Sequence, residues 1–293
     1  MTTLRYGYFP GCVTPLKENA YELSMRKVAE KLDIRLMELA GANCCGFFVE
    51  PVDHLSATIL GAGNIALMEE SGCDAITVCP ACFGHLTRVR NSLLEDATLK
   101  NEVNKALKEI NKKFEGTSKI KHFASVLLQD VGIEKIKSTI TKPLSQLKVA
   151  PHYGCHILKP SDELNLDNPE DPKLLDSLIE VTGAKLVNYV EKKMCCGAPV
   201  MGVDEKLSLT IAREKLKSIK KAGADVMVTV CSYCHVHFDL NQLSIQEKFS
   251  EEYNIAVLHF TQLLGLAQGY MPEELGLYEN RVPIDSILSK MQK

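Results

Sequence analysis

The chain has 293 residues, of which 45% are apolar and 24% are charged, and its formal net charge is -3. These values are typical of a globular protein with a sizeable core, and the near-neutral charge argues against a dedicated nucleic-acid-binding protein. No apolar run approaches the ~20 residues that span a bilayer, and the opening MTTLRYGYFP has no secretory leader pattern, so we expect a cytoplasmic protein without a transmembrane segment.

Short apolar strands alternate with amphipathic helices along the chain. In the first half, strands are predicted at 4–9, 34–39, 75–79 and 119–123, and helices at 18–32 and 55–71. In the second half, strands are predicted at 148–153, 185–190, 226–231 and 255–260, and a helix at 207–221. This alternation predicts an α/β fold of βα units with mainly parallel sheets.

Ten of the eleven cysteines form two matched sets. Each set has a lone cysteine, a vicinal pair followed by glycine, and a CxxC motif. The first set is Cys12, Cys44, Cys45, Cys79 and Cys82, and the second set is Cys155, Cys195, Cys196, Cys231 and Cys234. Similar intervals and matching flanks, such as ANCCGFF with KMCCGAP, indicate a tandem repeat. We therefore predict two βα domains with pseudo-two-fold symmetry, at 1–142 and 147–270, and a C-terminal tail at 271–293 that packs on its own domain or docks a partner.

The repeat also predicts where the thiols meet. Ligands of open α/β sheets bind at the carboxyl ends of the strands, and each set has cysteines at such ends, so the thiols should converge at the domain interface. Adjacent cysteines on a regular strand point to opposite faces, so a sharp turn is needed, which Gly46 and Gly197 permit through a positive φ. The eleventh cysteine, Cys73, aligns with Ala224 in the repeat and is predicted to be a small core residue.

Three kinds of chemistry use such thiols. A four-iron cube or a structural zinc takes four ligands, and each half offers five. The CPAC segment at 79–82 looks like a thioredoxin-type dithiol, but its counterpart CSYC lacks the proline, and a dithiol leaves the vicinal pair unexplained. Iron–sulfur clusters are therefore favoured, and two structural zinc sites remain an alternative.

At these residues the sequence resembles the cysteine-rich CCG domain. Two tandem copies without a ferredoxin segment resemble the B subunits of methanogen heterodisulfide reductases. The resemblance implies that each set holds a non-cubane [4Fe-4S] cluster, with all ten cysteines of the two sets as cofactor and metal ligands. It further implies reduction of the coenzyme M–coenzyme B mixed disulfide to two thiols in methanogenesis, with one electron from each cluster.

The same resemblance implies the electron source. The partners would be a ferredoxin-like C subunit and a flavin-bearing A subunit, with a hydrogenase behind them. A GxG within 60–66 lies in a helical stretch, so no flavin or NAD site is predicted in this chain. CCG domains also occur in iron–sulfur subunits of succinate, glycolate and lactate dehydrogenases, which makes an electron-relay subunit the alternative function.

The anionic groups of the mixed disulfide require cationic neighbours. Basic side chains near the cysteines are His85, His152, His156, Lys159, Lys193, His235 and His237. His156 and His235 each directly follow a cysteine of the second set. They are predicted to contact the substrate or to give a proton to a leaving thiolate.

Overall fold

The computed structural model describes residues 3–291 and contains two four-stranded parallel sheets. The first sheet has the order β2-β1-β3-β4, with β1 Leu4–Tyr8, β2 Ile34–Glu38, β3 Ala75–Thr77 and β4 Ile120–His122. The second has the order β6-β5-β7-β8, with β5 Lys148–His152, β6 Lys185–Leu186, β7 Val226–Thr229 and β8 Ala256–His259. Both halves therefore have the same strand order, and the predicted α/β fold of two similar βα units is confirmed.

Helices follow the strands in both halves. The first half contains α1 Val13–Lys17, α2 Asn19–Lys31, α3 His54–Glu70, α4 Pro80–Glu95, α5 Ala97–Lys108, α6 Phe123–Val126, a π-helical turn Leu127–Val131 and α7 Ile133–Ser138. The second half contains α8 Ser161–Leu164, α9 Leu174–Glu180, α10 Glu205–Lys221, α11 Ser232–Phe249, α12 Phe260–Ala267 and α13 Asp285–Met291, with short 3-10 turns at Val190–Lys193 and Ala198–Val200. No helix within residues 3–291 is long and apolar enough to cross a membrane.

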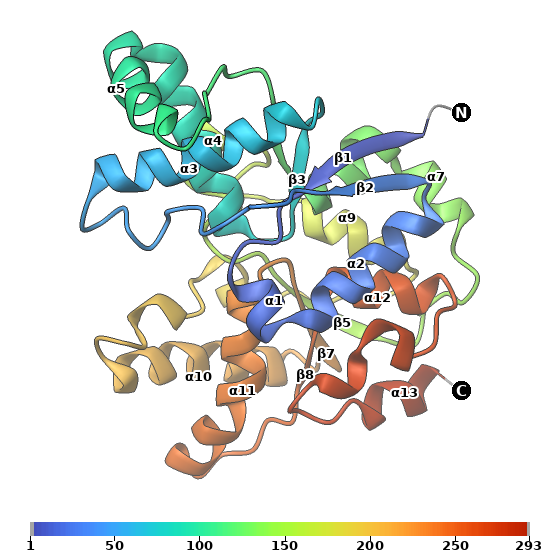
Figure 1. Cartoon of the computed structure of the whole chain (residues 1–293). Helices are drawn as coiled ribbons and strands as arrows, with labels where there is room; N and C mark the ends of the chain where they lie inside the picture. The colour runs from blue at the N-terminus through green and yellow to red at the C-terminus, as the bar shows by residue number, and fades with distance from the viewer. Residues whose placement is uncertain (1–2, 292–293) are drawn as a thin grey trace.

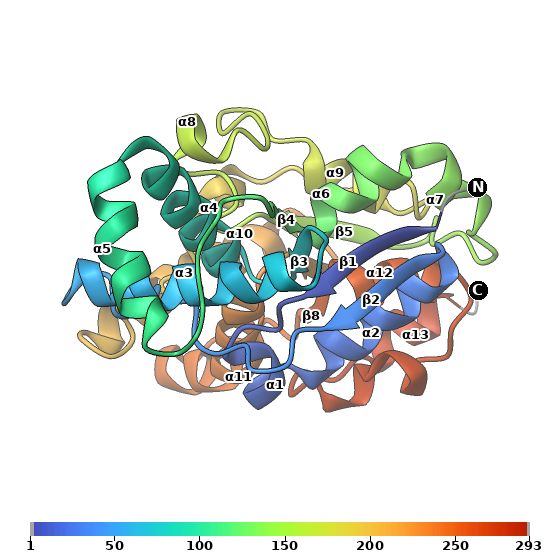
Figure 2. The same cartoon turned by 45° about the horizontal axis from the view of Figure 1, so that its top comes forward.

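A continuous hydrophobic core joins the two halves. Helices α2, α6, α9 and α12 lie between the sheets, where α2 packs on α12 and α9 packs on α6 (Figures 1 and 2). Tyr21 and Met25 of α2 and Leu264 of α12 are fully buried in this layer. Each such side chain contributes about 1.5–3 kcal/mol by burial, so the interface holds the two halves in one fixed arrangement.

Two outer cores cover the far faces of the sheets. In the first half α3, α4 and α5 pack against the sheet through residues such as Ile65 and Leu86, and in the second half α10 and α11 do so through Leu216 and Phe238. Figure 1 shows these helices at opposite ends of the molecule, with the inner helices between them. The strand ends that carry cysteines therefore face each other across the middle.

The segment after α12 packs against both halves. Leu275 and Leu277 enter the shared core, and a Cβ at Gly276 would lie 2.8 Å from the Cβ of Ala20 on α2. The Asp239 carboxylate of α11 accepts hydrogen bonds from the backbone of the same segment at 2.7 and 3.0 Å. The tail was expected to pack on its own domain or to dock a partner; its described residues, up to 291, pack on the second half and also on α2 of the first.

Candidate functional site

Each CxxC motif begins a helix directly after a strand. Cys79 precedes α4 and Cys231 precedes α11 as the N-cap residue. The hydroxyl of Thr77 accepts a hydrogen bond from the backbone N–H of Cys79 at 3.3 Å, and Thr229 does the same for Cys231 at 3.2 Å. Both motifs therefore stand at a helix N-terminus, a position that favours the thiolate form of a cysteine.

A left-handed turn follows each vicinal pair, as the repeat predicts. Gly46 has a φ of 102° and Gly197 a φ of 92°. A Cβ at Gly46 would lie 2.5 Å from the carbonyl oxygen of Ala57, and one at Gly197 would lie 2.8 Å from that of Ser208. Only glycine fits the conformation and the contact, so the turn that follows each vicinal pair depends on it.

Thiols from both halves line one cavity. The lining cysteines are Cys12, Cys45, Cys79, Cys82, Cys155, Cys196, Cys231 and Cys234. Cys44 and Cys195 directly precede the lining cysteines of the two vicinal pairs, and Cys195 is within hydrogen-bonding reach of Cys155 and Cys196. The structure thus brings eight of the ten predicted cysteines into one cavity between the halves, and the other two adjoin it in the chain.

The thiols of each set perturb one another strongly. Hydrogen bonding to Cys82 lowers the pKa of Cys79 to about 7, and that of Cys45 is lowered for the same reason. Hydrogen bonds from Cys155 and Cys196 lower the pKa of Cys195 to about 2. Neighbouring thiols within each set are therefore within hydrogen-bonding reach of one another, and thiolates are the form that binds metal.

The donor set and its surroundings fit an iron–sulfur cluster or a zinc ion. Five soft sulfur donors per half are the ligands that both groups prefer. Gly11 and Gly154 keep the centre open, because a Cβ at these positions would lie 2.9 Å from the Cys82 sulfur and 3.4 Å from the Cys234 sulfur. The remaining lining side chains, apart from His156, are apolar or aromatic: Val13, Phe47, Phe48, Pro80, Ala81, Tyr153, Pro199 and Tyr233.

His156 is the histidine that lines this cavity within residues 3–291. Its ring packs edge-on against Phe47 of the other half, with ring centres 4.7 Å apart. Burial lowers the pKa of His156, which favours the neutral imidazole. A neutral imidazole in an apolar cavity can both donate and accept one hydrogen bond.

The other predicted substrate-contacting histidine, His235, lies elsewhere. Its Nδ1 is 3.0 Å from a carboxylate oxygen of Glu18, and its Nε2 is 3.0 Å from the carbonyl oxygen of Val257. It borders a separate cavity with Lys17 and Arg281. The expected substrate contact therefore needs correction: Glu18, which the motif did not indicate, holds this ring away from the thiol cavity.

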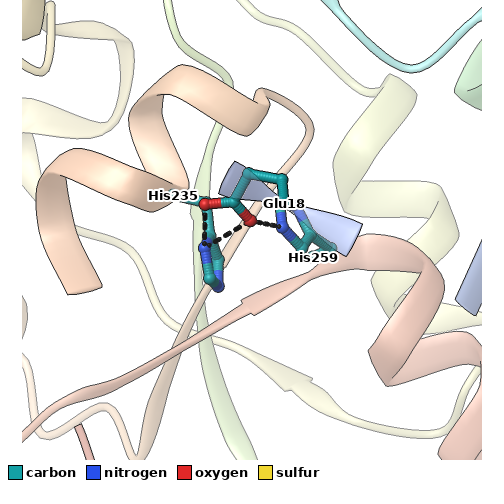
Figure 3. Close-up of side chains that lie close together, drawn as sticks. All are labelled: Glu18, His235 and His259. Carbon is teal, nitrogen blue, oxygen red and sulfur yellow. Dashed lines mark hydrogen bonds and ion pairs between the residues drawn. The ribbon is translucent and has the colours of Figure 1, made fainter. Parts of the chain in front are cut away.

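Glu18 is a buried carboxylate between two histidines of the other half (Figure 3). Its second partner is His259 Nε2, at 2.6 Å, and the rings of His235 and His259 stack with centres 4.0 Å apart. Burial alone would raise the pKa of Glu18, but the hydrogen bonds from both histidines lower it to about 2. This cluster links the halves through a charged contact beneath the site.

Three other basic residues near the cysteines have structural partners. His85 Nδ1 lies 3.1 Å from Glu50, and His237 Nδ1 lies 2.8 Å from Asn241. Lys193 pairs at the surface with Glu170, 3.1 Å away. Among residues 3–291, no lysine or arginine lines the thiol cavity.

One buried cation beside the second set was not predicted. Lys215 of α10 has no exposed surface, and its Nζ lies 3.0 Å from His152 Nδ1 and donates to the Met194 carbonyl at 2.7 Å. Burial lowers the pKa of Lys215 to about 8. A lysine on the apolar stripe of an amphipathic helix was the available signal.

Cys73 lies away from the thiol cavity, between α3 and β3. Its sulfur is 3.3 Å from the Ser71 hydroxyl, and it is only partly buried. We expect Cys73→Ala to retain the full metal content and to cost about 1 kcal/mol or less in stability. Metal analysis and thermal unfolding test this; loss of metal would mean that the first set is wrongly assigned.

Comparison with known proteins identifies relatives over almost the whole chain. The cysteine-rich domain family CCG matches residues 6–87 and 149–239. The B subunit of the ferredoxin/F(420)H(2)-dependent CoB-CoM heterodisulfide reductase of Methanosarcina acetivorans is 42% identical over 97% of this chain and 95% of the relative. A protein of Archaeoglobus profundus, described as similar to the heterodisulfide reductase B subunit, is 36% identical over 93% of each chain.

Two further proteins are similar to this chain, one in sequence and one in fold. The membrane anchor subunit of the 8-methylmenaquinol:fumarate reductase of Wolinella succinogenes is 33% identical over 94% of this chain and 96% of the relative. A solved structure of a hypothetical protein from Helicobacter pylori superposes with a TM-score of 0.77 at 16% identity, over 96% of this chain. This chain spans 52% of the length of that protein, and the likeness concerns the fold alone.

Proposed function

The chain belongs to the CCG cysteine-rich domain family, and on that basis we propose that it is the iron–sulfur subunit of a reductase that cleaves the coenzyme M–coenzyme B mixed disulfide. The observation that carries the proposal is the single cavity lined by both cysteine sets. Both sulfur atoms of one disulfide must be reached from one place. The identity of 42% to a heterodisulfide reductase B subunit over nearly the full length supports the same substrate.

We propose that the two sets each hold one non-cubane [4Fe-4S] cluster. The ligands would be the first set, Cys12, Cys44, Cys45, Cys79 and Cys82, and the second set, Cys155, Cys195, Cys196, Cys231 and Cys234. When bound, the two clusters supply the two electrons, one from each, that cleavage of the S–S bond consumes. The glycine turns at Gly46 and Gly197 orient the vicinal ligands, and the inner helices fix the distance between the sets.

The other residues that line the cavity supply a proton and keep water from the sulfur atoms. Conversion of one disulfide to two thiols takes up two electrons and two protons. In this proposal His156 first takes up a proton from solvent, then gives it as the imidazolium to one thiolate and returns to the neutral ring that burial favours. The other thiolate takes its proton from solvent as the product leaves. Phe47, Phe48 and Tyr233 keep water away from the sulfur atoms, which favours thiol over solvated thiolate. His235 has no part in this step, since Glu18 and Val257 occupy both of its ring nitrogens.

The electrons come from another protein in this proposal. A ferredoxin-like C subunit and a flavin-bearing A subunit, fed by a hydrogenase, are the partners that the family relation supports. Relatives are described as B subunits of heterodisulfide reductases or as a subunit of a fumarate reductase, so a multi-subunit complex is common to them.

An electron-relay subunit of a succinate, glycolate or lactate type of dehydrogenase is the second candidate. The fumarate reductase relative, 33% identical over 94% of this chain, favours it. A relay needs clusters within tunnelling range but no opening for a small molecule between them. The apolar cavity shared by the two sets supports the first candidate instead.

The deciding experiment is EPR spectroscopy of the anaerobically purified, oxidised protein. Analysis should first find about eight irons per chain with acid-labile sulfide, as two four-iron clusters require. Addition of the mixed disulfide or of coenzyme M thiol should then change the cluster signal. An unchanged spectrum without disulfide turnover would favour the relay function, and zinc without sulfide would exclude both redox functions.

A further inference from the structure

Two equivalent buried positions differ in charge between the halves. Helices α3 and α10 both begin after an aspartate N-cap, Asp53 and Asp204, and Asn64 and Lys215 lie equally far beyond these caps. Both side chains are buried against the segment that carries the vicinal cysteines. The repeat therefore places a neutral amide in the first half where the second half has an amine.

Both side chains hold the segment of the vicinal cysteines in place through hydrogen bonds to its backbone. Asn64 Nδ2 donates to the Cys44 carbonyl at 3.0 Å, and its Oδ1 accepts from the backbone N–H of Asn43 at 3.0 Å. Lys215 Nζ donates to the carbonyl of Met194, which directly precedes the second vicinal pair. Hydrogen bonding alone would be served by an amide in both halves, so anchoring does not explain the positive charge.

The difference extends to a second position. Lys215 Nζ also bonds His152 Nδ1 at 3.0 Å, and His152 lies three residues before Cys155. The residue three positions before Cys12 is the buried Phe9. The second half therefore has a lysine and an imidazole where the first half has an amide and a phenyl ring.

The ammonium group has no carboxylate partner. Within residues 3–291 the hydrogen-bond partners of Lys215 are His152 and the carbonyls of Glu191 and Met194. A buried charge is costly unless an opposite charge compensates it. Burial lowers the pKa of Lys215 to about 8, while negative charge on Cys234, Cys196 and Cys195 and on the Glu191 carboxylate opposes that shift. The compensating negative charge therefore comes from the sulfurs of the second set together with Glu191.

We propose that Lys215 makes the two iron–sulfur sites unequal, so that the cluster of the second set is reduced before the cluster of the first. The inference rests on the function proposed above. An electron adds one negative charge to a site, and a buried cation nearby favours the reduced form. Asn64 offers a dipole but no net charge, so the first site lacks this stabilisation. Lys215 touches neither the substrate nor the reacting atoms in this proposal. Its charge sets the order in which the two clusters accept electrons.

Potentiometric titration followed by EPR tests the proposal in the reconstituted full-length chain. Lys215→Gln keeps hydrogen-bond donors and removes the charge. At a fixed potential it should lower the ratio of reduced to oxidised cluster at the second site by about tenfold, a shift of about 59 mV for a one-electron couple. The first site should not change. Lys215→Arg is the matched control, and it should keep the wild-type ratio because it keeps the charge.

Variants that retain only one cluster show which site Lys215→Gln affects. The shift should persist when Cys79→Ser removes the first cluster, and Cys231→Ser should remove the shifted signal. Equal midpoints in wild type and Lys215→Gln, with iron and sulfide intact, would overturn the inference and leave the proposed function standing. Loss of the second cluster in Lys215→Gln would also overturn the inference, because the role of Lys215 would then be to hold the cysteine segment in place. A wild-type protein without sulfide would instead overturn the proposed function, and the inference with it.

Discussion

Cys195→Ser is expected to abolish turnover of the mixed disulfide and to remove about half of the iron, since one of two four-iron sites is lost. Cys195 lies within hydrogen-bonding reach of Cys155 and Cys196, and these bonds lower its pKa to about 2, which favours the thiolate that binds metal. A serine hydroxyl stays protonated and is a poor ligand for iron. Cys44→Ser, at the matching position, should have the same effect on the first set. Iron and sulfide analysis, EPR and a disulfide reduction assay measure the three losses.

The matched control is Cys73→Ser, the same substitution outside both sets. It should keep all iron and the wild-type turnover. Retention of both cluster signals in Cys195→Ser would show that the vicinal pair contributes only one ligand, and the five-cysteine assignment would have to be given up.

Glu18→Ala should lower the free energy of unfolding by about 3–5 kcal/mol, the usual cost of removing one partner from a buried ion pair. Glu18 is 5% exposed and contacts His235 and His259, which lie on α11 and β8 of the other half. Without the carboxylate, both imidazoles stay buried and lose a hydrogen-bond partner. The thermal midpoint at a fixed scan rate should fall by roughly 6–15 °C.

Glu163→Ala is the control for this substitution. Glu163 also faces the other half, through Arg88 at 3.9 Å, but its side chain is 45% exposed. An exposed pair of this kind contributes about 0–1 kcal/mol. A Glu18→Ala midpoint no lower than that of Glu163→Ala would mean that the buried cluster does not stabilise the contact between the halves.

The sequence allowed much of the fold to be predicted, because the alternation of strands and helices is periodic and is repeated. All eight strands were expected, although β6 ends at Leu186 instead of residue 190. There the chain leaves the sheet, since the Tyr189 hydroxyl donates to the Pro151 carbonyl at 2.7 Å and a 3-10 turn follows. The order of strands within each sheet was not predicted, because no local pattern encodes which parallel strands pair.

The candidate site, too, could be predicted only in part from the sequence. The cysteines repeat at similar intervals, so the sequence predicted that their thiols meet at one place. The turns at Gly46 and Gly197 were predicted from the geometry of a vicinal pair. Glu18 was missed because both of its partners lie more than 200 residues away along the chain. Lys215 could have been found from its place on the apolar stripe of α10, and a comparison of α10 with α3 would then have shown that the first half has Asn64 there.

The packing of the segment after α12 has a consequence for the order of folding. Synthesis runs from the N-terminus, so α2 is made early, with Tyr21 and Met25 directed toward partners that do not yet exist. Its cover consists of α12 and of Leu275 and Leu277, which follow more than 200 residues later in the chain. The nascent first half therefore carries an exposed apolar surface until that segment has been translated. Such a surface is a target for chaperones and a risk for aggregation.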